Sequence, residues 1–417
     1  MSATSEKQLV TPLEDESNPE AENDVHVQQL GSALSSMTDD CSDSRTEAHE
    51  TILAPAHSER HTSSWGLGQY LKAGVARFTK DAAYYHYGNY VADRATGERT
   101  FEQMPIYTRV GMHILYCGSV EAAMLKSSRA QELFIQESIK MGKSFDDASS
   151  RAKIPGFIKT FNLDTSDLLI QDPAGYPNFN AFFARALKPG ARPVSEPGDE
   201  GVMVSAADCR LVVFPSLTLA QQFWIKGRRF SVPALLGPRC SDVAAAYAAG
   251  SISIFRLAPQ DYHRWHTPLS GTVTRIVDLA GSLMTVNPMA INEDLDIYTE
   301  NKRSVAFLAT PHAKTPVLVI AVGAMLVGSI EWTVREGDVL TKGQEMGKFL
   351  YGGSTVLVLT PGDLPVQFDP DLLSNSEGQV IPANTVDPGE AQLSRGACET
   401  QVRVGERVGK LTPGSVQ

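Results

Sequence analysis

A series of short apolar runs between residues 210 and 359 constrains the fold of this chain more than any other feature. Each run is rich in Val, Ile, Leu or Phe and is bounded by Gly, Pro, Asp or Asn, a pattern typical of β-strands joined by turns. The clearest runs are Arg210–Phe214, Ser251–Leu257, Gly271–Val277, Val317–Val322 and Thr355–Leu359. We therefore predict a β-rich core.

A glycine-spaced segment, Val334–Phe349, interrupts these runs with the cue V-x-x-G-x-x-L-x-x-G-x-x-x-G. Glycines at this spacing suit tight turns between short strands, much as in lipoyl-carrier hairpins. The Asp-Lys pair found at the tip of a lipoyl hairpin is absent from the segment, which argues against a carrier role.

The first part of the chain has a different character. Residues 1–60 are acidic and poor in aromatic side chains, so we expect them to be disordered. Residues 61–165 show apolar residues at helical spacing, as in Met104–Tyr116 and Ser127–Met141. The fold class expected is therefore α+β: an acidic tail (1–60), an N-terminal helical region (61–165) packed on the core, and a β-rich catalytic core (166–417).

Charge and composition exclude several classes of protein. Residues 1–60 carry 13 acidic and 3 basic side chains, hence 10 of the 11 net negative charges, so the remainder has no basic surplus for a nucleic-acid partner. The five cysteines form no CxxC pair, which favours a reducing compartment. The acidic start is unlike a mitochondrial presequence. The longest apolar stretch, Pro316–Gly328, is too short for a membrane-spanning helix. We expect an intracellular, non-mitochondrial protein, either cytoplasmic or peripheral on an endomembrane.

Three short segments carry candidate chemistry. Gly352-Gly353-Ser354 precedes the last of the apolar runs, and on its own it would be an ordinary loop before a strand. As a reactive site, the glycine before the serine leaves its carbonyl open to attack by the Ser354 hydroxyl.

The second segment, Asp261–Gly271, contains His263 and His266, three residues apart. This is a metal-pair spacing only on a helix, and Pro268 disfavours a helix here. A histidine base is the functional alternative, and a hydrogen-bonded structural histidine is the ordinary one. In the third segment Asp208 precedes a strand, where an aspartate usually forms a turn. Together Asp208, His266 and Ser354 supply the residue types of a charge-relay triad.

These segments resemble the phosphatidylserine decarboxylases, in particular the eukaryotic type II branch. The resemblance covers nearly everything from Thr96 to Gly409, and LAPQDYHR and GGST occur together at the expected separation. It is carried by TGERTFEQMPIYTRVGMHILY (96–116), FNAFFARALKPGARPV (179–194), VSAADCRL (204–211), WIKGRRFSV (224–232), FRLAPQDYHRWHTPLSG (255–271), AVGAMLVGSI (321–330), EGDVLTKGQEMGKFLYGGSTVLVL (336–359) and ETQVRVGERVG (399–409).

The resemblance implies a proenzyme that cuts itself between Gly353 and Ser354, giving a β chain (1–353) and an α chain (354–417) that stay associated. It places the charge relay on Asp208, His266 and Ser354, and gives His263 a part in proton transfer during decarboxylation. Ser354 would become a pyruvoyl group that forms a Schiff base with the substrate amine, the role that pyridoxal phosphate plays elsewhere. Neither pyridoxal phosphate nor a metal is expected, since none of the nine histidines is followed by lysine and no ligand cluster is evident.

The implied substrate is phosphatidylserine, with phosphatidylethanolamine and CO₂ as products. Two alternatives stay open: the same chemistry on a free amino acid, and a non-catalytic scaffold on the same fold. Segments resembling the C2 and calcium-binding modules of type II members are not found, so any membrane contact is expected to be peripheral, through stretches such as Gly66–Phe78. The sequence departs from the family at Cys209, where glycine or serine is usual, and in an apparent insertion at 380–396.

Overall fold

The computed structural model describes residues 89–102, 139–140, 142–223, 225, 230–282, 297–323, 329–350, 354–378 and 397–412. Several predictions from the sequence lie outside these ranges. They are the acidic tail (1–60), the helix at Met104–Tyr116, most of that at Ser127–Met141, the membrane stretch Gly66–Phe78, the insertion at 380–396 and Gly353 itself.

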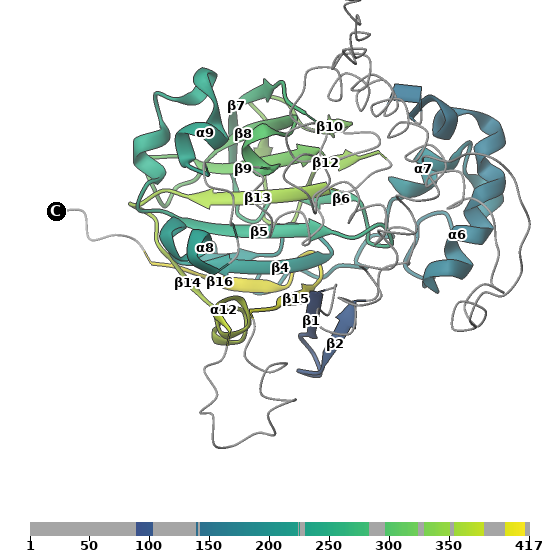
Figure 1. Ribbon diagram of the computed structural model, residues 1–417, viewed down its shortest axis with the longest axis horizontal. Coiled ribbons are helices and arrows are strands. Elements are labelled where there is room, and N and C mark those ends of the chain that lie inside the picture. The colour runs from purple at the N-terminus through teal and green to yellow at the C-terminus, as the bar shows by residue number, and fades with distance from the viewer. Residues whose placement is uncertain are drawn as a thin grey trace, which may run out of the picture.

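A twisted ten-stranded sheet forms the centre of the described chain (Figure 1). Neighbouring strands are antiparallel, except that β1 runs parallel to β15. The order across the sheet is β11 (Val339–Leu340), β7 (Gly271–Leu279), β8 (Arg303–Ala309), β9 (Val317–Gly323), β13 (Ser354–Thr360), β5 (Ser251–Leu257), β4 (Cys209–Phe214), β15 (Glu399–Val402), β1 (Asn89–Asp93) and β2 (Arg99–Glu102).

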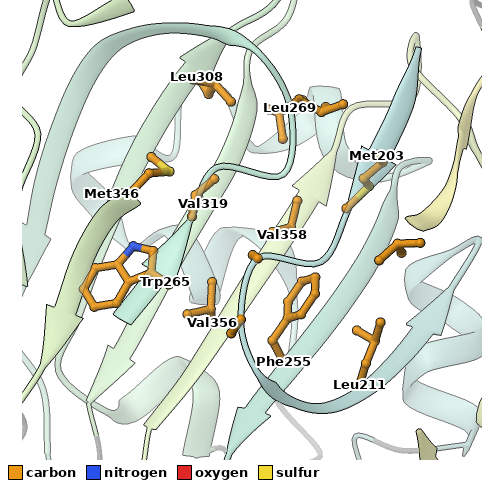
Figure 2. Packing of buried hydrophobic residues seen from close by; sticks show 14 of the residues in the cluster. Met203, Leu211, Phe255, Trp265, Leu269, Leu308, Val319, Met346, Val356 and Val358 are labelled. Atoms are coloured by element: carbon orange, nitrogen blue, oxygen red, sulfur yellow. The ribbon is translucent and has the colours of Figure 1, made fainter. Parts of the chain in front are cut away.

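The central strand β13 shows why the apolar runs are continuous rather than alternating. Its side chains point by turns to the two faces of the sheet, and both faces are buried. Leu357 and Leu359 enter one core cluster, whereas Val356 and Val358 enter the other, which Figure 2 shows. All five strands predicted from the apolar runs are confirmed, Ser251–Leu257 with unchanged bounds.

The two faces are covered differently. Helices pack on the first face: α8 (Leu217–Phe223), α9 (Val232–Leu236), the 3₁₀ turn η5 (Ala244–Tyr247) and α11 (Ile297–Glu300). Two three-stranded sheets supply the second cluster with apolar side chains, Trp265 and Met346 among them (Figure 2). Their strands, in order, are β10 (Ile330–Trp332), β12 (Glu345–Phe349) and β6 (Arg264–His266), then β14 (Val366–Phe368), β16 (Arg407–Leu411) and β3 (Val202–Val204).

The remaining described helices are α6 (Ile154–Phe161), α7 (Phe179–Phe183), α12 (Pro370–Glu377) and the 3₁₀ turns η2 (Ala148–Lys153), η3 (Pro173–Gly175) and η4 (Pro238–Cys240). Both α6 and α7 lie to one side of the large sheet in Figure 1 and share an aromatic core. The Asn178 side chain accepts from the amide of Ala181 at 2.8 Å, so it caps the start of α7.

Strands β1 and β2 differ from expectation, because they lie within residues 61–165, where the pattern predicted helix. They form a hairpin that joins the sheet through β15, a partner about three hundred residues away. Nothing in the local pattern reveals such a partner.

Glycine turns separate β10, β11 and β12 at Gly337 and Gly343, as predicted, whereas Gly347 lies within β12. Gly337 has a φ of +94° and Gly343 a φ of +82°, conformations that other residues rarely adopt. The protein is therefore a mixed α and β structure in which strands dominate the described part. None of the helices in that part has the length and apolar character needed to cross a membrane.

Candidate active site

Ser354 is the first residue of β13 and lies in the middle of the large sheet. It pairs with Leu257 of β5 on one side and with Gly323 of β9 on the other. The residue is only 1% exposed, and its Oγ has no hydrogen-bond partner among the described residues. A buried hydroxyl without a partner is costly in a folded protein, which makes Ser354 a candidate for a role beyond packing, although Thr355 and Thr360 of the same strand also have such hydroxyls.

His263 follows β5 on a tight turn. Its Nδ1 lies 2.9 Å from the carbonyl oxygen of Asp261, and a carbonyl only accepts, so Nδ1 carries the proton. The ring packs on Phe183 with centroids 3.9 Å apart. Its Nε2 is buried with no partner in the described part of the chain. Burial, aided by the nearby charge of Arg185, lowers the pKa of His263 to about 3, so the ring is neutral near pH 7.

Two buried arginines hold the turn that carries His263, and the sequence analysis did not single them out. Arg185 Nη2 donates to the carbonyl oxygens of Gln260 and Asp261, both at 2.7 Å. Arg210 forms an ion pair with the Asp261 carboxylate, which also accepts from the amide of Ala258 at 2.7 Å. The signal in the sequence was that all three residues belong to quoted segments: Arg185 to 179–194, Arg210 to 204–211 and Asp261 to 255–271.

His266 ends β6, and both of its ring nitrogens have partners. Nδ1 lies 2.8 Å from the carbonyl oxygen of Gly343, and Nε2 lies 3.1 Å from the hydroxyl of Tyr262. Burial lowers the pKa of His266, while the Gly343 hydrogen bond and the charges of Glu345 and Asp208 act in the opposite direction. On β6 the neighbouring Trp265 enters the core over the large sheet, so His266 points to the other face of its strand.

Asp208 binds other groups. Its carboxylate accepts from Arg192, with Nη2 at 2.6 Å from Oδ2 and Nε at 3.0 Å from both oxygens. It also accepts from the amide of Val404 at 2.9 Å. The segment is close to His266, whose amide donates to the carbonyl of Ala206 at 2.7 Å. The hydrogen bonds of the described residues nevertheless do not join Asp208 to His266, nor His266 to Ser354.

Cys209, beside Asp208, is part of the core. Its side chain is buried in the core cluster that also holds Leu211 and Val213. Burial raises the pKa of the Cys209 thiol well above its usual value, so the side chain is a small neutral core residue.

Comparison with known proteins identifies the family of the chain. The family model for phosphatidylserine decarboxylase matches residues 179–410, which contain all of the candidate site residues. A phosphatidylserine decarboxylase proenzyme 2 from Komagataella phaffii is 45% identical over 291 residues, covering 70% of this chain and 28% of the relative. Its namesake from Oryza sativa is 41% identical over 293 residues, covering 69% and 45%. The proenzyme from Chlamydia pneumoniae is 38% identical over 229 residues, covering 54% and 73%.

The matched part spans 24% to 31% of the length of the fungal relatives and 73% of the chlamydial one. More than half of the sequence, including the central strand and both motif histidines, falls within the family model. The chain therefore belongs to the phosphatidylserine decarboxylase family.

Proposed function

We propose that this protein is a self-processing, pyruvoyl-dependent carboxy-lyase that converts phosphatidylserine to phosphatidylethanolamine and CO₂. The observation that carries the proposal is the buried, unpartnered hydroxyl of Ser354 at the start of the central strand, directly after two glycines. The names of the relatives, which are called proenzymes, support the same chemistry.

In the processing step, the Ser354 hydroxyl attacks the carbonyl carbon of Gly353. His266 takes the hydroxyl proton and later returns it to the departing amide nitrogen, while the charge of Asp208 favours the protonated ring. The new ester then breaks by β-elimination, which frees the carboxylate of Gly353. Water hydrolyses the remaining dehydroalanine, and ammonia leaves. The products are chains 1–353 and 354–417.

The surroundings of Ser354 fit conversion to a pyruvoyl group. The change removes one hydroxyl, and that hydroxyl donates to no acceptor among the described residues, so no described hydrogen bond is lost. The group supplies an electron sink for the pair released as CO₂ departs. His263 contributes a neutral ring with a free Nε2 lone pair, which suits it to accept and return a proton of the substrate amine.

The two product chains stay associated in this proposal. Strand β13 of the small chain lies between β9 and β5 of the large one, and β15 lies between β4 and β1. Separating the chains would remove two strands from the sheet and expose both core clusters. We also propose that the chain divides into an acidic tail (1–60), an N-terminal region (61–165) and a β-rich core (166–417), and that Val334–Phe349 resembles lipoyl-carrier hairpins.

A phospholipid substrate requires contact with a bilayer surface. We propose that this contact is peripheral and involves residues 61–80, an amphipathic stretch that includes Lys72 and Arg77 and lies outside the described ranges.

The test begins with mass spectrometry of the purified protein. We expect a small chain beginning at position 354 with a pyruvoyl group in place of the serine amine. Release of CO₂ is then measured with phosphatidylserine vesicles and with a panel of free amino acids. An uncut chain would support a scaffold, and turnover of a soluble amino acid alone would support the alternative substrate.

A further inference from the structure

The ring of His266 is held at both nitrogens, and the two partners differ in kind. The Gly343 carbonyl only accepts, so the hydrogen must sit on Nδ1, 2.8 Å away. Nε2 then keeps its lone pair and accepts from the Tyr262 hydroxyl at 3.1 Å. These two contacts specify one tautomer and one orientation of the ring.

The backbone around Gly343 is built to present that carbonyl. Its φ of +82° is accessible to glycine, and a Cβ at this position would lie 2.4 Å from Cγ2 of Val194. The Gly343 amide donates to the carbonyl of Thr267 at 2.9 Å, and the Thr267 amide donates to the carbonyl of Gln344 at 2.8 Å. This pair of bonds ties the turn to the residue that follows His266.

The side chain of Lys342 anchors the other side of the same turn. Its Nζ donates to the carbonyl oxygens of Glu196 and Asp199 at 2.9 and 2.8 Å, and its amide donates to Ser270 Oγ at 3.0 Å. The turn is therefore fixed on both sides of Gly343, which limits the freedom of its carbonyl.

The carboxylate of Asp208 is engaged elsewhere. Both of its oxygens accept from Arg192, and Oδ1 also accepts from the Val404 amide. A second carboxylate, that of Asp167, binds the same guanidinium at 2.8 Å. Asp208 thus binds the side chain of Arg192 and the backbone of Val404, whereas the His266 ring is bound by other groups.

We propose that the carbonyl of Gly343 and the hydroxyl of Tyr262, rather than the carboxylate of Asp208, fix the tautomer and orientation of the His266 imidazole. The inference rests on the proposed function, because it assigns two positioning residues to the base of the self-cleavage step. With Nδ1 protonated, Nε2 is the ring nitrogen left to accept a proton in the proposed cleavage step, which it does once the Tyr262 hydroxyl has moved away from it.

The tautomer is measured directly in a chain that does not cleave. The Ser354→Ala protein is labelled with ¹⁵N-histidine, and His266 is assigned by its loss in a Ser354→Ala, His266→Gln protein. We expect ring ¹⁵N shifts of a neutral imidazole protonated at Nδ1. Protonation at Nε2, the form that free imidazole side chains prefer, would overturn the proposal. This ¹⁵N measurement requires neither cleavage nor decarboxylation. It therefore tests the tautomer of His266 even if the proposed function is wrong.

Matched variants then separate the candidate partners. Gly343→Ala should lose the ring ¹⁵N shifts that mark protonation at Nδ1, here called the Nδ1–H signature, whereas Gly337→Ala should keep them. Both glycines have a positive φ, but only Gly343 has a close neighbour at the position of a Cβ. Asp208→Asn should also keep the signature. Loss of the signature in Asp208→Asn, with retention in Gly343→Ala, would return the orienting role to the carboxylate.

Tyr262→Phe leaves the backbone unchanged and so tests the second contact even where Gly343→Ala fails to fold. In the cleavable chain we expect this variant to cleave itself about tenfold more slowly, because one neutral hydrogen bond to the base is lost. A tenfold change in rate corresponds to about 1.4 kcal/mol of activation free energy. A cleavage rate equal to that of the parent would exclude Tyr262 from positioning the base.

Discussion

A buried ion pair joins the two product chains of the proposed cleavage. Arg256 of β5 precedes the cut and Glu399 of β15 follows it, and β4 lies between the two strands in the sheet. Arg256 Nε donates to Glu399 Oε1 at 2.7 Å, and Nη2 donates to the other oxygen. The two side chains are 7% and 2% exposed, so water screens this pair very little.

Replacing Glu399 with glutamine keeps the shape of the side chain and removes its charge. The buried guanidinium of Arg256 then faces a neutral amide in place of the Glu399 carboxylate. Breaking a buried pair in this way typically costs about 3–5 kcal/mol, which is a factor of roughly two to four orders of magnitude in the folding equilibrium.

The free energy of unfolding is measured by urea titration of the uncut Ser354→Ala chain, with and without Glu399→Gln. Lys410→Gln is the matched control, because Lys410 and Asp199 form a 2.9 Å ion pair that also crosses the cut but is 51% and 38% exposed. Solvent screens that pair, so the control should unfold at nearly the same urea concentration as the parent. Equal stability of Glu399→Gln and parent, or an equal loss in the control, would refute the reasoning.

Three further predictions concern the site and its surroundings. His266→Ala should slow self-cleavage by about 10²- to 10⁴-fold on a gel time course, as loss of a general base does. Asp208→Asn should also slow it, because it removes one of the charges that oppose the lowering of the His266 pKa by burial. Normal cleavage in His266→Ala would show that His266 is not the base and would make His263 the next candidate. The pKa of His263 falls from 6.5 to about 3 on folding. Between pH 3 and pH 6.5 the unfolded chain therefore binds a proton at His263 that the folded chain does not, so the free energy of unfolding declines as the pH drops below 6.5. In urea titrations from pH 6 to pH 5 this proton accounts for up to about 1.4 kcal/mol per pH unit, and His263→Gln should flatten that slope. In flotation assays, deleting residues 61–80 should weaken salt-sensitive binding to anionic vesicles while cleavage persists, and unchanged binding would place the contact elsewhere.

The predicted site residues met different outcomes in the structure. Ser354 heads the central strand, and His263 lies on a turn held by Arg185 and Arg210. Their residue types and motifs made both easy to single out. The partners of His266 were not predictable in this way, because Gly343 acts through its carbonyl, and every residue has one. Tyr262 stood within a quoted motif, yet only the fold brings its hydroxyl to Nε2.

The sequence alone determined five strands of the central sheet, namely β4, β5, β7, β9 and β13, and the family to which the chain belongs. A strand buried on both faces favours a nearly continuous apolar run, and the clearest example is Val317–Val322. Only the tertiary structure decided the order of the strands, the position of β1 and β2 beside β15, and the pairing of Arg256 with Glu399. These features join residues that are far apart along the chain. Their energies arise from burial and geometry that exist only once the sheet has formed, so no local pattern records them.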